Sequence, residues 1–137
     1  GQTTILLALA EAHCAAGQVE AGLDVISKAE QFEQETGEAR HLASLQKVKG
    51  DLYLLGEDED SAEKAYLSAI SVAQRESAKL LELEAVKPLA RLWQHQGKGK
   101  QAMRMLQEIY DWFTEGFDTP MLVEARKLLE DLASENQ

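Results

Sequence analysis

Small residues and larger, often aromatic, side chains recur along this chain at a regular separation of 40 residues. The most conspicuous series is His13, Tyr53 and Trp93, and the separation between its members is called the repeat spacing below. Four further series keep the same spacing: Ala10, Gly50 and Ala90; Gly22, Ala62 and Ala102; Ile26, Tyr66 and Leu106; Ala29, Ala69 and Ile109. Small residues let helices approach closely, and larger ones fill the space between them. Five series in agreement indicate an internal repeat, which constrains the fold more than any other feature of the sequence.

The composition favours helices. Leu, Ala, Glu, Lys and Gln are abundant, and only 2 of the 137 residues are proline. No stretch of strand length alternates cleanly between apolar and polar residues, so we predict no strands. At 137 residues the chain is long enough to bury a substantial core, and 45% of its residues are hydrophobic. We therefore predict an all-α fold in a single domain, residues 1–137.

Turn and cap residues divide the chain into three helix pairs and a last helix. The predicted repeats cover about 3–36, 37–76 and 77–116, and a capping helix covers about 119–134. The individual helices are predicted at about 3–16, 19–35, 38–55, 59–76, 78–96, 100–115 and 120–134. The last of them carries one apolar face, formed by Leu122, Ala125, Leu129 and Leu132.

The stretch from Trp93 to Pro120 contains the clearest signals for where helices begin and end. Gly97 suits the left-handed conformation that closes a helix. The next helix is predicted to have one apolar face, formed by Ala102, Leu106, Ile109 and Phe113. Gly116 is predicted to end it, and Asp118 or Thr119 to cap the following helix ahead of Pro120.

The formal net charge is −10, which disfavours nucleic acid as a partner because phosphate binding requires cations. The single cysteine, Cys14, excludes an intrachain disulfide and fits a reducing cytoplasm. No segment is apolar enough for a membrane helix, and the start of the chain does not resemble a signal peptide. We expect a cytoplasmic chain that begins inside a longer protein, since it has no initiator methionine.

Several sequence patterns that suggest a phosphate-binding, metal-binding or catalytic site are incomplete. Gly97-Lys98-Gly99-Lys100 lacks the upstream glycine, the following Ser or Thr and the preceding strand of a phosphate-binding loop. The acidic run at 57–60 lacks the glycine and glutamate of a calcium loop. The three histidines have no ligand spacing, and no Ser, Cys or Thr has an evident base. We expect no catalysis, no cofactor and no metal.

The repeat resembles the tetratricopeptide repeat (TPR) in a variant of about 40 residues. Residues 90–132 more narrowly resemble the C-terminal end of bacterial signalling proteins. Those proteins join a nucleotide cyclase, winged-helix or LuxR-type output domain to an ATPase module and a TPR-like array. The shared motifs are ARLW at 90–93, QG at 96–97, WFTEGFDT at 112–119 and EARKLL at 124–129.

The resemblance implies a right-handed α-α superhelix, a TPR-like solenoid of three helix pairs and a cap. It also implies the terminal part of a sensor array, with ATPase and output domains upstream. Its concave face would present Lys47, Asp51, Leu54, Lys87, Arg91, Gln94 and His95, together with Leu7, Glu11 and Cys14. Lys47, Lys87 and Arg91 would form a basic strip there, or simply a solvated face. The asparagines of the clamp with which some TPRs grip a C-terminal carboxylate are missing.

The leading hypothesis is a non-catalytic protein-interaction and regulatory scaffold. Its partner would be a protein, a peptide or another domain of the parent chain, with no nucleic acid and no membrane. Self-association or capping of the solenoid is the alternative, because Ile5, Leu6 and Leu9 have no preceding repeat to cover them, and a homodimer could form there. A groove that senses a small-molecule effector is the third hypothesis.

Overall fold

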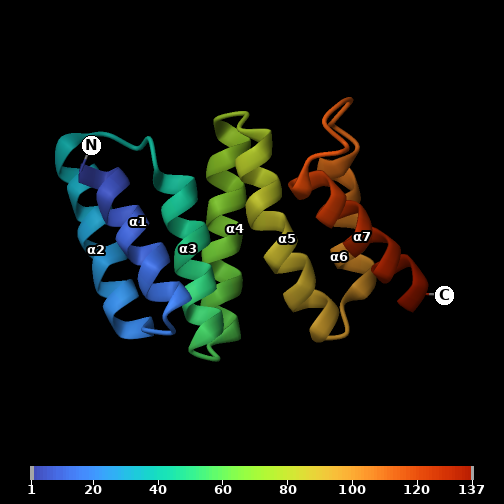
Figure 1. Cartoon of the computed structure of the whole chain (residues 1–137), viewed down its shortest axis with the longest axis horizontal. Helices are drawn as coiled ribbons and strands as arrows, with labels where there is room; N and C mark the ends of the chain where they lie inside the picture. Colours follow the sequence, from blue (N-terminus) through green and yellow to red (C-terminus); the bar gives the residue numbers. More distant parts are fainter. Residues whose placement is uncertain (1, 137) are drawn as a thin grey trace.

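The computed structural model describes residues 2–136, and this part of the chain is all-α, as predicted (Figure 1). Its helices run antiparallel in a row from the N-terminus to the C-terminus. They are α1 (Gln2–Ala15), α2 (Val19–Thr36), α3 (Leu42–Leu55), α4 (Glu59–Arg75), α5 (Lys79–His95), α6 (Gly99–Tyr110) and α7 (Pro120–Glu135). Both ends of α1, α2, α4, α5 and α7 lie within one residue of the prediction.

The predicted start of α3 at residue 38 is wrong, since the helix begins at Leu42. The carboxylate of Glu33, which is buried on α2, accepts the backbone N–H of His41 at 2.9 Å. This contact with α2 holds His41 just before the first residue of α3. Helical propensity depends on the local sequence and therefore cannot predict it.

The predicted end of α6 at residue 115 is also wrong, because α6 ends at Tyr110. The backbone N–H groups of Trp112 and Phe113 bond to carbonyls three residues earlier, a tightening typical of a helix end. Phe113 therefore does not continue the helical face, although its half-buried ring still packs against the core. Gly116, with φ of 78°, lies in the loop after the helix. Thr119 does occupy the N-cap of α7, and Pro120 follows in its first turn.

The turn inside each helix pair has the same backbone geometry at the repeat spacing. A left-handed residue occupies each turn, with φ of 74°, 61° and 81° at Gly17, Glu57 and Gly97. The next residue in each turn donates its N–H to a carbonyl five residues back: Gln18 to His13, Asp58 to Tyr53, and Lys98 to Trp93, at 2.8, 2.9 and 2.7 Å. The sequence repeat is therefore also a repeat of backbone structure.

The helices form two layers. Each helix packs against the next one along the chain, and α1, α3, α5 and α7 also contact one another in that order. Within residues 2–136, α2, α4 and α6 make no such contacts with each other. The odd-numbered helices thus form a continuous layer in which side chains from different pairs can meet.

The repeated positions supply the core. The small residues at Ala10, Gly50 and Ala90 are buried, and so are the larger ones across from them at Ile26, Tyr66 and Leu106. The middle pair needs glycine because a Cβ atom on Gly50 would lie 2.6 Å from the ring of Tyr66. The series of His13, Tyr53 and Trp93 is half-buried.

The two ends of the row differ in how well they are covered. On α7 the predicted apolar residues Leu122, Ala125, Leu129 and Leu132 are buried. On α1, Ile5 is 69% exposed and Leu9 is 44% exposed, whereas Leu6 is half-buried. No helix in the described part of the chain combines the length and the apolar character that crossing a membrane requires.

Candidate functional site

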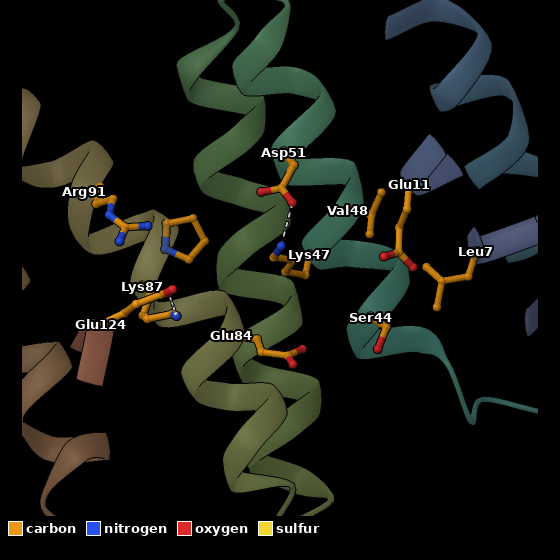
Figure 2. A pocket seen from close by; sticks show the side chains of 11 residues that line it. Leu7, Glu11, Ser44, Lys47, Val48, Asp51, Glu84, Lys87, Arg91 and Glu124 are labelled. Carbon is orange, nitrogen blue, oxygen red and sulfur yellow. Dashed lines mark hydrogen bonds and ion pairs between the residues drawn. The ribbon is translucent and has the colours of Figure 1, made fainter. Parts of the chain in front are cut away.

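The odd-numbered helices enclose a groove of about 460 Å³ (Figure 2). Four helices contribute its lining: Leu7 and Glu11 from α1; Ser44, Lys47, Val48 and Asp51 from α3; Glu84, Lys87, Pro88 and Arg91 from α5; Glu124 from α7. These positions again follow the repeat spacing, as in Ser44, Glu84 and Glu124, or Leu7, Lys47 and Lys87. The groove is therefore lined by the same face of each odd-numbered helix.

The structure brings six of the predicted concave-face residues together in this groove. They are Leu7, Glu11, Lys47, Asp51, Lys87 and Arg91. Two more, Cys14 and Leu54, line an adjoining cavity of about 490 Å³ that shares Asp51, Pro88 and Arg91 with the groove. The two cavities therefore form one continuous surface, polar along α3 and α5 and more apolar near Leu54.

The remaining two predicted residues lie outside both cavities. The side-chain amide of Gln94 donates to Glu135 of α7 at 2.9 Å. His95 is exposed in the last turn of α5. Both lie on the same face of α5 as Lys87 and Arg91 but one turn further along the helix, beyond the two cavities.

Sequence reasoning missed Ser44, Val48, Glu84, Pro88 and Glu124. A usable signal existed, because Ser44 and Glu84 precede Lys47 and Lys87 by one helical turn and are themselves separated by the repeat spacing. Glu124 continues that series into α7. The last helix therefore contributes to the groove as well as covering the end of the row.

Lys47 is paired within its own helix. Its ammonium lies 2.7 Å from one carboxylate oxygen of Asp51, and the hydroxyl of Tyr66 donates to the other. Burial, and then the charge of Asp51, raise the pKa of Tyr66 above its ordinary value, so its hydroxyl stays protonated and remains a donor. Both oxygens of Asp51 are thus engaged inside the protein.

Lys87 is paired across the groove. Lys87 is a buried residue, and its ammonium lies 2.8 Å from the carboxylate of Glu124, which α7 supplies. The hydrogen bond and the charge of Lys87 lower the pKa of Glu124 below its usual value. Two members of the predicted basic strip are therefore neutralised by carboxylates that also line the groove.

Arg91 differs from both lysines. Its side chain is exposed, and within residues 2–136 its guanidinium has no carboxylate at salt-bridge distance. Glu11 and Glu84 are likewise outside every ion pair in that range. The lining as a whole carries four carboxylates and three cations, so its charge is mixed.

Cys14 sits at the edge of the adjoining cavity. Partial burial, followed by the charge of Asp51, raises the pKa of its thiol, which keeps the thiol protonated at neutral pH. A protonated thiol is a weak nucleophile and a poor metal ligand. No three His, Cys, Asp or Glu side chains among residues 2–136 are grouped so that they could hold a metal ion.

Comparison of the sequence with protein-family models and with curated proteins gave no match. Judged by the ion pairs within residues 2–136, the groove is an open, preformed surface with one unpaired cation, two unpaired carboxylates and an apolar recess. Such a surface is suited to binding and orienting a charged segment.

Proposed function

We propose that this chain is a non-catalytic protein-interaction scaffold whose groove binds an extended or helical segment of another protein or domain. One observation carries the proposal: a single continuous groove receives side chains from α1, α3, α5 and α7 at matching positions of the repeat. A surface built by repetition extends over several helices. Such a surface suits a segment that makes many small contacts.

We further propose that the helices wind as a TPR-like right-handed superhelix, with the groove on its concave side. The repeated turn geometry supports this, because the two helices of each pair are then joined in nearly the same way. The layer contacts support it too. The odd-numbered helices touch one another whereas α2, α4 and α6 do not within residues 2–136, as expected if the odd layer lies on the inside of a curve.

In a larger protein, this segment would be the terminal part of a sensor array that regulates an ATPase and an output domain. The support is the resemblance of residues 90–132 to such proteins, together with the way α7 covers the end of the row. The bound segment would then come from another domain of the same chain or from a separate protein.

Self-association is the second candidate, favoured by the exposed apolar residues of α1. Ile5 is 69% exposed, although the matching Leu45, Ala85 and Ala125 are fully buried. Sedimentation velocity over a wide range of concentrations tests it. Dimerisation that Ile5→Glu abolishes would support this candidate, whereas a monomer at all concentrations would contradict it.

The groove proposal is tested by selecting randomised nine-residue peptides that bind the chain. Binding of the selected peptides is then compared in Ser44→Trp, which places an indole in the groove, and in Lys28→Trp, a control on the exposed side of α2. We expect Ser44→Trp to abolish binding and Lys28→Trp to leave it unchanged. Failure to enrich any peptide, or equal binding by both variants, would contradict the proposal.

A further inference from the structure

We propose that the segment held by the groove carries both a carboxylate and a cation, with the carboxylate at Arg91 and the cation between Glu11 and Glu84. The inference rests on the proposed function and adds the chemistry of the ligand. It follows from which charged groups of the lining already have partners and which do not.

The lysines of the groove are poor sites for an incoming anion. Lys47 lies 2.7 Å from Asp51, and Lys87 lies 2.8 Å from Glu124. An anionic ligand would have to displace a carboxylate that the fold already holds in place. A polyanionic partner, which a free basic strip would attract, is therefore disfavoured.

Arg91 is the cation that can accept a ligand carboxylate. It is exposed, and within residues 2–136 it forms no ion pair. A guanidinium binds a carboxylate with two parallel hydrogen bonds, which fixes orientation as well as charge. Arg91 also belongs to the adjoining cavity, where Leu54, Leu55 and Pro88 offer an apolar recess. An apolar side chain next to the ligand carboxylate would fill this recess.

The part of the groove away from Arg91 favours a cation. Figure 2 shows Glu11 on the far side of the Lys47–Asp51 pair from Arg91. Glu84 lies on α5, two turns before Arg91. Neither Glu11 nor Glu84 has a hydrogen-bond or ion-pair partner among the side chains of residues 2–136. Glu84 is half-buried, so its carboxylate has lost part of its hydration and gains from a ligand ammonium or guanidinium.

The helical geometry limits the spacing of the two ligand charges. Arg91 and Glu84 are about 10 Å apart along α5, at 1.5 Å per residue. Arg91 and Glu11 are two helix-packing distances apart, about 16–20 Å. Since an extended chain advances about 3.3 Å per residue, the two ligand charges should be about three to six residues apart.

The test repeats the peptide selection on charge-reversed variants. Peptides selected on the unaltered protein should pair an acidic residue with a basic one at that spacing and should bind Arg91→Glu at least about tenfold more weakly. Selection on Arg91→Glu should replace the acidic residue by a basic one. Selection on the double variant Glu11→Lys, Glu84→Lys should replace the basic residue by an acidic one. The matched controls Lys28→Glu and Asp24→Lys, both on exposed positions of α2, should leave the selected sequences unchanged.

The result separates this inference from the proposed function. Peptides that bind the unaltered protein and not Ser44→Trp, yet carry no paired charges or ignore the reversal of Arg91, would overturn the inference and leave the groove proposal standing. Peptides indifferent to Ser44→Trp would overturn both. Circular dichroism of each variant shows whether it keeps its helical fold, so that lost binding is assigned to the groove.

Discussion

The first helices of the first and second pairs, α1 and α3, hold the same place in the repeat but bury very different surfaces. Ile5 of α1 is 69% exposed, whereas Leu45, the matching residue of α3, is fully buried. The reason is the neighbour, since α2 packs against α3 whereas no described helix packs against that side of α1. Leu9 and Lys49, which also occupy matching positions of the repeat, show the same difference. Leu9 stays exposed, whereas Lys49 forms an ion pair with Glu30 of α2 at 3.5 Å.

The difference shows what a repeat can and cannot specify. The repeat spacing determines which face of a helix a side chain occupies. Whether that face is covered depends on the next element in space. Matched substitutions in the two pairs therefore separate the contribution of the residue from that of its surroundings.

The largest expected effect comes from truncating the two matched side chains. Leu45→Ala should cost about 2–5 kcal/mol of unfolding free energy, because it removes buried methyl groups and leaves a cavity. Ile5→Ala should change it by less than about 0.5 kcal/mol, since its side chain is mostly in water. Urea denaturation of both variants measures the difference. Equal losses would mean that α1 is covered in solution.

The second prediction concerns the room for Tyr66 in the middle pair. Gly50→Ala places a methyl group 2.6 Å from the Tyr66 ring, so it should destabilise the protein by about 1–3 kcal/mol. Elsewhere in a helix the same change would stabilise by about 1 kcal/mol. Adding Tyr66→Leu recreates the third pair's combination of Ala90 with Leu106, and Gly50→Ala should then no longer cost stability.

A double-mutant cycle in urea gives the coupling between positions 50 and 66. The matching substitution in the first pair, Ala10→Gly, serves as the control, because Ile26 leaves room for the methyl group already present. Additive effects at positions 50 and 66 would show that the ring does not select the glycine.

The third comparison is between the left-handed residues of two matching turns. Gly97 has a φ of 81°, a conformation in which a side chain is strained. Gly97→Ala should therefore lower the free energy of unfolding by about 1–2 kcal/mol. Glu57 already bears such a strain at φ of 61°, so Glu57→Gly should stabilise the protein by less than about 1 kcal/mol, the gain being reduced by the freer unfolded chain. Thermal unfolding should shift in opposite directions for the two variants; shifts in the same direction would contradict the shared turn geometry.

The smallest effect is a dependence on pH at the start of α4. Asp58 accepts the backbone N–H of Ser61 at 3.2 Å. Hydrogen bonding to the side chain of Ser61, and then to its backbone N–H, lowers the pKa of the Asp58 carboxylate. A lowered pKa in the folded state contributes stability above the unfolded pKa, and that stability is lost as the pH falls through the folded pKa. Asp58→Asn keeps a capping oxygen but cannot titrate.

Unfolding measured between pH 7 and pH 2 should therefore show a smaller acid loss for Asp58→Asn than for the unaltered protein. Asp60→Asn, in the same first turn but outside that hydrogen bond, is the control. Identical acid profiles for Asp58→Asn and the unaltered protein would exclude this contribution.

The sequence predicted the helices well because their signals are local. Gly17 and Gly97 end helices through a conformation that glycine adopts freely, and Pro120 begins one where its missing N–H costs nothing. The two wrong boundaries have another origin. His41 is held by Glu33 of a neighbouring helix, and the chain after Tyr110 turns early while Phe113 packs against the core.

The groove was only partly predictable for a similar reason. Lys47, Lys87 and Arg91 follow from the repeat, because position within a helix fixes the face. The ion pair of Lys87 does not follow, since Lys87 meets Glu124 across 37 residues and only the placement of α7 brings the two together. The difference between a basic strip and a mixed-charge groove therefore lies in tertiary contacts.

The most direct test of the account is to map the bound peptide by amide chemical-shift changes in NMR spectra of the isotope-labelled chain. The groove proposal predicts that the largest changes fall on α1, α3 and α5, around Glu11, Ser44, Lys47, Glu84 and Arg91, with little change along the exposed side of α2. Changes concentrated on α2, α4 and α6, or in the loop at 111–119, would contradict it.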